Sequence, residues 1–149
     1  MQTRGAIYHH SQLVFHNGFI GKKYLILLNS PDRKEPYLFV KATSQQKDKP
    51  AKVGCIKERS LFFIPAGNNT FFKKDTWIQL YELYPIPPED IDSIDKITLE
   101  GTLDVRIIDY VVNYLFLAEE KNISPIFKNF LRPSIQNSLL KLQEKFNKK

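Results

Sequence analysis

The sequence has almost no cysteine and no long apolar run, and both absences exclude whole classes of protein. The single cysteine, Cys55, excludes an internal disulfide framework and a metal site built from several cysteines. No run approaches the roughly 18 apolar residues of a membrane-spanning helix. The N-terminal segment MQTRGAIYHH also lacks the apolar core of a signal peptide. We therefore expect a soluble protein of the cytoplasm that does not contact a membrane.

The common motifs of phosphate and nucleophile chemistry are also missing. The chain contains no GxxxxGK[ST] or GxGxxG loop and no GxSxG nucleophile turn. His9 and His10 are adjacent, so on a strand they would point to opposite faces, and two imidazoles without a third ligand make a poor zinc site. The sequence therefore predicts no bound metal and no cofactor.

Charge is spread unevenly along the 149 residues. Residues 1–88 carry 13 lysines and arginines against 6 acidic residues, residues 89–123 carry 3 against 9, and residues 124–149 carry 6 against 1. A basic first part is typical of a face that binds a polyanion. A solvated, lysine-rich surface would have the same composition, so charge alone leaves both interpretations open.

Short apolar runs separated by turn residues predict a mainly β protein. We expect a strand over residues 5–16, a tight turn at Asn17–Gly18 and a loop over 44–54. Further strands are predicted at residues 24–29, 37–42, 60–67 and 71–86. Because no helix separates these strands, the pattern favours a small, highly curved antiparallel barrel over a parallel sheet.

Helical patterns are confined to the C-terminal part. Residues 94–101 predict a short helical turn, and the acidic residues just before it suit the first turn of a helix. An apolar stripe predicts a packed helix over 103–119, capped at Thr102. A second, basic amphipathic helix is predicted over 124–147. We therefore divide the chain into a barrel domain with its packed helix, 1–121, and a C-terminal extension, 122–149.

Several stretches follow one another in a characteristic order: Gly5, GKKYLILLN (21–29), VKATSQ (40–45), FFKKDTWIQLYELYPI (71–86) and IDKITLEGTLD (94–104). This serial order resembles the MazF/PemK family of toxin endoribonucleases over residues 5–119. No single stretch is highly specific, and the order carries the resemblance. The helix beyond about residue 123 lies outside the family pattern.

The resemblance implies an SH3-like barrel, often a homodimer, that cleaves single-stranded RNA without a metal ion. In that family a ribose 2′-hydroxyl attacks its own phosphate, leaving 2′,3′-cyclic phosphate and 5′-hydroxyl ends. The positions of the family's catalytic arginine and threonine are held here by Lys23 and Thr43. The residues expected to guide RNA are His16, Asn17, Lys22, Ser44, Gln45 and Lys49. An acidic antitoxin protein is the expected partner.

Lys23 is the main departure from the family. The attack builds negative charge on a phosphorane, which a fixed cation stabilises. Lysine supplies the charge without the planar bidentate fork of arginine. Losing one such donor costs about 3 kcal/mol in other enzymes, so the exchange predicts slow cleavage or none. Outside the resemblance, Lys23 is a surface residue beside a strand and Thr43 caps a turn.

A second hypothesis follows from that departure. The same barrel without catalysis would act as a module that binds RNA, or that binds a protein as the related gyrase-directed toxin CcdB does. Salt-dependent RNA binding without a product would support the RNA-binding version of this hypothesis.

Overall fold

The computed structural model describes residues 3–32, 34–46, 48–67, 71–93, 96–119 and 121–131. In these ranges the strands are β1 (Ala6–Val14), β2 (Ile20–Leu27), β3 (Tyr37–Thr43), β4 (Gly54–Ile56), β5 (Leu61–Ile64), β6 (Thr76–Ile86) and β7 (Ile97–Thr102). The helices are the short 3-10 helix η1 (Lys57–Arg59), α1 (Pro88–Ser93), α2 (Val105–Glu119) and α3 (Pro125–Leu131).

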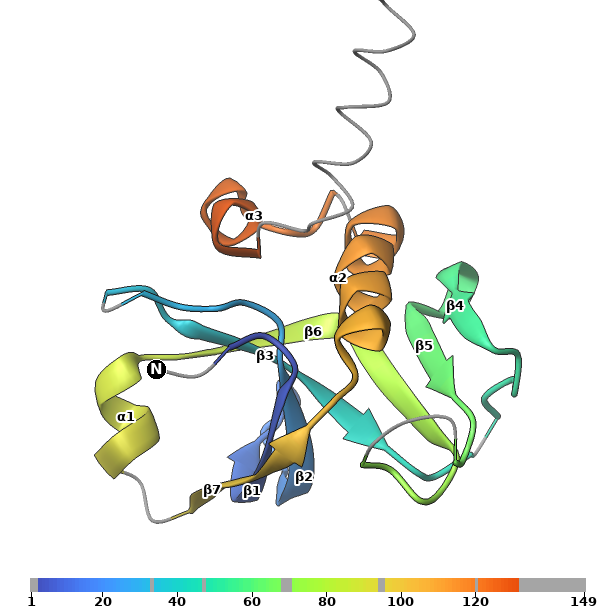
Figure 1. Cartoon of the computed structure of the whole chain (residues 1–149), viewed down its shortest axis with the longest axis horizontal. Coiled ribbons are helices and arrows are strands. Elements are labelled where there is room, and N and C mark those ends of the chain that lie inside the picture. The colour runs from blue at the N-terminus through green and yellow to red at the C-terminus, as the bar shows by residue number, and fades with distance from the viewer. Residues whose placement is uncertain are drawn as a thin grey trace, which may run out of the picture.

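The seven strands in this part of the chain form one antiparallel sheet, in the order β4-β5-β6-β3-β2-β1-β7. The predicted mainly β, antiparallel class is confirmed. The predicted closed barrel is wrong for the described residues, because β4 and β7 each pair with one neighbour and stay apart as edges (Figure 1). With only three residues, β4 offers little length for closing the sheet.

The first two strands form a hairpin arm that extends past the end of β3. Its turn is the predicted one, with Gly18 at a φ of +90° and the Asn17 side chain accepting a hydrogen bond from the Phe19 backbone. Pairing between β2 and β3 begins only at Tyr24. The first four residues of β2, at 20–23, therefore pair with β1 and not with β3, and two of them are lysines.

Side chains of β3 alternate between two cores. Leu38, Val40 and Ala42 belong to the core that packs against α2, whereas Tyr37 and Phe39 belong to a second core on the other side. We call these two sides of the sheet the helix face and the far face. Because successive residues of a strand point to opposite sides, the polar residues of β3, at 41 and 43, lie on the far face.

A large bulge distorts the pairing of β3 with β6. Between the pairs Phe39–Tyr84 and Lys41–Gln79, one residue of β3 stands opposite four residues of β6, 80–83. Extra residues of this kind bend a strand and turn its side chains in new directions. An acidic side chain from the bulge reaches Lys41 in this way.

The helix α2 covers the helix face with the predicted apolar stripe. Its buried residues are Ile108, Val111, Val112 and Leu115. The Asp104 side chain caps the helix by accepting a hydrogen bond of 2.9 Å from the Arg106 backbone. The predicted cap at Thr102 is therefore wrong, because this residue ends β7 instead.

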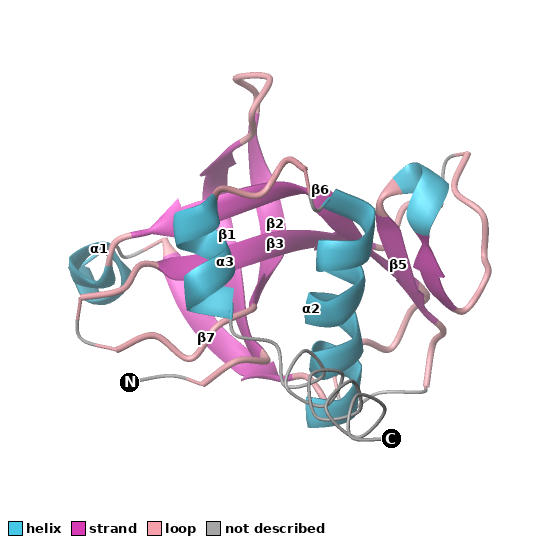
Figure 2. Ribbon diagram, turned by 90° about the horizontal axis from the view of Figure 1, so that it is seen from above, coloured by secondary structure: helices cyan, strands magenta, loops and turns pink. Residues whose placement is uncertain are grey.

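The helix α3 lies on the same side of the sheet as α2 (Figures 1 and 2). Pro125 occupies its first position, and the Ser124 hydroxyl accepts a hydrogen bond from the Phe127 backbone at 3.2 Å. Leu131 at its end is buried in the core beside α2. The predicted helix over 124–147 thus begins as expected, and residues 132–149 lie outside the described part of the chain.

Two edge strands differ from the sequence predictions. The short helical turn expected at the start of 94–101 falls largely on residues 94 and 95, which lie outside the described residues. The rest of this stretch was not predicted as a strand, and Ile97–Thr102 pair with β1 as the edge strand β7. β-Branched residues at 97 and 98 suit that pairing. β4, formed by Gly54–Ile56 beside β5, was also not predicted, and only its Gly54 lay in the loop expected over 44–54. Its Gly54 takes a φ of +89°, which only glycine adopts readily.

Candidate functional site

The hairpin arm carries an aromatic ring that contacts two lysines on the far face. The Lys41 ammonium lies 4.7 Å from the centroid of the Phe15 ring, and the Lys23 ammonium lies 5.9 Å from the same centroid. The ring lies against the backbone of Gly21, where an added Cβ would come within 2.9 Å of it. Glycine at this position is therefore what allows Phe15 to pack beside both cations.

Lys41 is a buried cation in an otherwise apolar strand. Only 7% of it is exposed, and its ammonium lies 3.3 Å from a carboxylate oxygen of Glu82. An unpaired charge at such a depth would cost several kcal/mol, roughly. The ion pair with Glu82 and the contact with the Phe15 ring together offset the positive charge of Lys41, so Lys41 attracts an anionic ligand only weakly.

Glu82 is the anionic centre of the site. Its carboxylate accepts a short hydrogen bond from the Tyr84 hydroxyl, and one of its oxygens lies 3.8 Å from Nδ1 of His16. Burial acts to raise the pKa of Glu82, but the Tyr84 hydrogen bond and the charge of Lys41 outweigh it and lower this pKa. Burial and the same carboxylate raise the pKa of Tyr84. Glu82 is therefore ionised while Tyr84 is a hydroxyl donor.

His16 stands where the hairpin arm reaches the β6 bulge. Its ring packs against Tyr84 with 4.8 Å between centroids, and about half of its side chain is exposed. Because Nδ1 faces Glu82, Nε2 is directed away from that carboxylate. A histidine oriented by a carboxylate in this way can exchange a proton with a ligand.

Lys23 is the half-buried cation of the cluster. Burial lowers its pKa, and the neighbouring charges of Lys41 and Lys49 lower it further. In the described part of the chain no carboxylate forms an ion pair with Lys23. Glu82 pairs with Lys41 alone among these lysines, so Lys23 and Lys49 leave an excess of positive charge, which favours an anionic ligand.

Thr43 shares the far face with Lys23. Tyr24 pairs with Ala42, so Lys23 and Thr43 are the next residues along two neighbouring strands, and alternation directs both to the far face. Thr43 is largely buried, and its hydroxyl accepts a hydrogen bond of 3.2 Å from the Gln45 backbone. The geometry thus fits both the proposed catalytic role of Thr43 and a role in capping the strand end.

The loop after β3 brings a further predicted residue to the site. The Lys49 ammonium donates to the Gln45 carbonyl at 3.1 Å, and Trp77 Nε1 donates to the Pro50 carbonyl at 2.9 Å. These bonds hold the loop beside the strand ends. Lys49 therefore lies close enough for its charge to act on Lys23.

Three other predicted residues lie outside this cluster. Lys22 is exposed and alternates to the helix face with Tyr24, so it points away from Lys23. Asn17 is exposed at the hairpin tip, where its side chain serves the turn. Ser44 is exposed at the end of β3. The structure thus gathers Lys23, Thr43, Gln45, Lys49 and His16 and leaves Lys22, Asn17 and Ser44 at the periphery.

Sequence reasoning missed several contributors to the cluster, namely Phe15, Lys41, Gln79, Glu82 and Tyr84. Lys41 had a visible signal, because a charge inside the apolar run YLFVKA is unusual for a buried strand. Glu82 had none, because only the bulge of β6 directs it toward Lys41.

Gln79 adds a polar group with one unsatisfied end. It is 8% exposed and pairs with Lys41 across the strands, and its Nε2 donates to the Tyr81 hydroxyl at 2.6 Å. Its Oε1 is buried and meets no donor among the described residues. Buried carbonyl groups are rarely left in this state, so this oxygen is a polar group beside Lys41 that the described residues leave unsatisfied.

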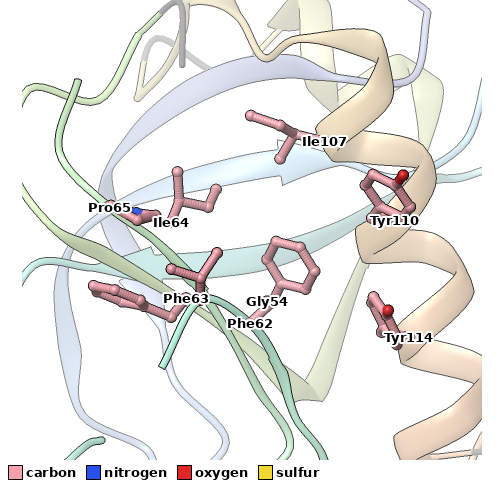
Figure 3. Close-up of a pocket in the computed structure, with 9 residues that line it drawn as sticks. Gly54, Phe62, Phe63, Ile64, Pro65, Ile107, Tyr110 and Tyr114 are labelled. Atoms are coloured by element: carbon pink, nitrogen blue, oxygen red, sulfur yellow. The ribbon is translucent and has the colours of Figure 1, made fainter. Parts of the chain in front are cut away.

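A separate apolar hollow lies between α2 and the β4–β5 edge (Figure 3). It has a volume of about 290 Å³, and its lining includes the rings of Phe62, Tyr110 and Tyr114. Figure 3 shows the two tyrosines on α2 facing the strand residues. No charged side chain among the described residues lines it, so its lining offers no partner for the phosphates of a nucleic acid.

Comparisons with known proteins give no relative for this chain. No family model matches it, and no curated protein matches it significantly. Within the described ranges, no group of three or more His, Cys, Asp or Glu residues is placed to hold a metal ion. None of the helices in these ranges is long and apolar enough to cross a membrane.

Proposed function

We propose that the protein is an endoribonuclease of the MazF/PemK type that cleaves single-stranded RNA without a metal ion. One observation supports this most: a half-buried lysine, Lys23, has no carboxylate partner among the described residues and lies close to the charges of Lys41 and Lys49. The open sheet would then be a variant of the SH3-like barrel of MazF, PemK and CcdB, in which β4 and β7 do not pair with each other.

The proposed reaction needs a base, a stabilising cation and an acid. His16, oriented through Nδ1 by Glu82, takes the proton of the ribose 2′-hydroxyl at Nε2. The 2′-oxygen attacks phosphorus, and the charge on the phosphorane is stabilised by Lys23 with the hydroxyl of Thr43. The bond from phosphorus to the 5′-oxygen then breaks, and water acts as the acid that gives this oxygen its proton, while the proton held at His16 Nε2 is released to solvent. The products are a 2′,3′-cyclic phosphate and a 5′-hydroxyl.

Other residues hold the substrate and the site. Lys49 supplies a second cation beside Lys23. Lys41 and Tyr84 keep Glu82 ionised and in position. Lys22, Asn17, Ser44 and Gln45 are exposed around the cluster and would guide the RNA backbone.

The partners proposed with this function follow from charge and from the family. An acidic, partly disordered antitoxin would be attracted to the basic residues 1–88, which carry 13 lysines and arginines against 6 acidic residues. Such a partner would compete with RNA for the same positive surface. We also propose that the protein forms a homodimer, as the family resemblance implies.

The test of this function is incubation of the protein with end-labelled single-stranded RNA in EDTA. We expect cleavage by the wild-type protein and by Lys34→Ala, a control that removes an exposed lysine from the β2–β3 connection. Lys23→Ala should lose at least a hundredfold in rate, about the effect of removing one oxyanion donor. Undiminished cleavage by Lys23→Ala would refute the proposed role of Lys23.

The alternative function is RNA binding without cleavage. The presence of lysine where the family has arginine favours it, because lysine cannot form the bidentate contact. Lys23→Arg separates the two functions. If Lys23→Arg cleaves RNA faster than the wild type does, the protein is a weakened ribonuclease. If neither protein cleaves RNA and both bind it in a salt-dependent way, the protein is a binding module.

A further inference from the structure

A second hollow, of about 470 Å³, lies where β3 ends and β6 begins. Its volume falls in the range of small-molecule sites, about 300 to 1,000 Å³. Thr43 and Ser44 at the strand end belong to its lining, as do the two exposed lysines Lys73 and Lys74. The hollow therefore combines hydroxyl groups with cations, in contrast to the apolar hollow beside α2.

Three aromatic rings form one wall of this hollow. Tyr24 meets Phe71 edge to face at 5.4 Å between centroids, and Phe71 meets Phe72 at 5.0 Å. The ring of Phe71 packs against Gly101 of β7, where an added Cβ would come within 2.8 Å of it. Tyr24 remains 38% exposed despite these contacts, so part of the aromatic wall is accessible to a ligand.

The cations of this hollow are available to an anion. In the described ranges neither Lys73 nor Lys74 forms an ion pair with a carboxylate. Lys22 is a third exposed lysine, and it alternates to the same face of β2 as Tyr24. An apolar peptide would gain nothing from these charges, whereas a nucleotide presents both a flat base and a phosphate.

The hollow adjoins the cluster that contains Lys23. Tyr24 follows Lys23 in β2. Thr43 lines the hollow, and it lies on the strand next to Lys23, one residue beyond the Tyr24–Ala42 pair. A strand of RNA that places one phosphate at Lys23 would therefore carry a neighbouring nucleotide around the end of β3 toward Tyr24.

We propose that this hollow is a nucleotide subsite, in which a base stacks on the accessible face of the Tyr24–Phe71 wall and a phosphate binds Lys73 and Lys74. Aromatic faces beside lysines are the common means by which proteins bind single-stranded nucleic acid. The inference rests on the proposed function for its choice of RNA as ligand. It adds Tyr24, Phe71, Lys73 and Lys74, which lie outside the cleavage cluster, to the residues that bind RNA.

The test is binding of a fluorescein-labelled, single-stranded 2′-O-methyl RNA, which has no free 2′-hydroxyl and is not cleaved. Tyr24→Leu should weaken binding by about 5- to 150-fold, the effect of one lost stacking contact. Tyr24→Phe should restore it, because the ring is kept. Tyr110→Leu, at an exposed tyrosine on α2, is the matched control and should bind as the wild type does.

The lysines are tested by the salt dependence of the same binding. For single strands each neutralised phosphate contributes about 0.7 to the slope of log affinity against log salt. The double variant Lys73→Ala/Lys74→Ala, which removes both cations from one phosphate, should therefore lower the magnitude of that slope by about 0.7, whereas Lys34→Ala should leave it unchanged. Near-ultraviolet circular dichroism of each variant checks that it remains folded.

The two proposals fail in different ways. Binding that depends on Tyr24, without cleavage of ordinary RNA by the wild type, would leave the subsite standing and refute the ribonuclease. The subsite alone would be overturned by a different set of results. In that case the wild type cleaves ordinary RNA, folded Tyr24→Leu binds as tightly as the wild type, and the lysine double variant has an unchanged salt slope.

Discussion

The ion pair between Lys41 and Glu82 gives the sharpest prediction about stability. Glu82→Gln keeps the size of the side chain and an acceptor for the Tyr84 hydroxyl, but it removes the charge that Lys41 faces at 3.3 Å. Removing one partner of a buried ion pair costs about 3 to 5 kcal/mol. Because 19% of the Glu82 side chain is exposed, we expect the lower end, about 3 kcal/mol.

The partner variant should behave differently. Lys41→Met removes the buried cation and leaves Glu82 with its hydrogen bond from Tyr84, so we expect a loss of only about 1 kcal/mol. In Lys41→Met/Glu82→Gln neither charge remains. The double variant should therefore be more stable than Glu82→Gln alone, with a coupling energy of about 1 to 3 kcal/mol.

The assay is urea denaturation followed by the fluorescence of Trp77. This residue is the only tryptophan in the chain, and it is 1% exposed in the native structure. With an m-value of about 2 kcal/mol/M, a loss of 3 kcal/mol lowers the midpoint by about 1.5 M. A Glu82→Gln midpoint equal to that of the wild type, or strictly additive losses in the double variant, would refute the ion pair as described.

Three further predictions concern pH and two glycines. The pKa of Glu82 is lowered by folding, so the ionised carboxylate stabilises the protein above its unfolded pKa, and this stabilisation is lost as the pH falls through the folded pKa. At pH values below about 4, the urea midpoint of the wild type should therefore fall. This fall should be smaller in Glu82→Gln. Gly21→Ala should displace the Phe15 ring and slow RNA cleavage several-fold in a rate assay, while a normal rate would show that Phe15 does not position the lysines. Gly5→Ala should lower the free energy of unfolding, measured by urea denaturation, by about 1 to 3 kcal/mol. Gly5 has a φ of +97°, which strains an alanine, and its carbonyl accepts the backbone hydrogen bond of Leu103. A midpoint equal to that of the wild type would contradict this expected strain.

Local signals in the sequence were sufficient to predict most of the elements. The Asn17–Gly18 turn, the apolar run of β3 and the apolar stripe of α2 each follow from neighbours within a few residues. The edge strand β7 was missed because it is stabilised by pairing with β1, which is distant in sequence. Closure of the sheet depends in the same way on contacts between its two ends, and no short pattern encodes them.

The candidate site was predictable in part for the same reason. Lys23 and Thr43 come together because β2 and β3 form a hairpin with a regular register, and a hairpin is a local structure. Glu82 and Tyr84 reach the cluster only through the bulge of β6, which changes the direction of side chains without a turn residue to mark it. A charge inside a buried strand, as at Lys41, was the one signal of the site that the sequence carried without a family resemblance.

The measurement that tests the central proposal most directly compares ordinary RNA with its 2′-O-methyl counterpart in EDTA. If the 2′-hydroxyl is the nucleophile, the protein will cleave ordinary RNA to 2′,3′-cyclic phosphate and 5′-hydroxyl ends, which mass spectrometry identifies. It will bind the 2′-O-methyl strand and leave it intact. Cleavage of the 2′-O-methyl strand, products with 5′-phosphate ends, or intact ordinary RNA at high protein concentration would contradict the proposal.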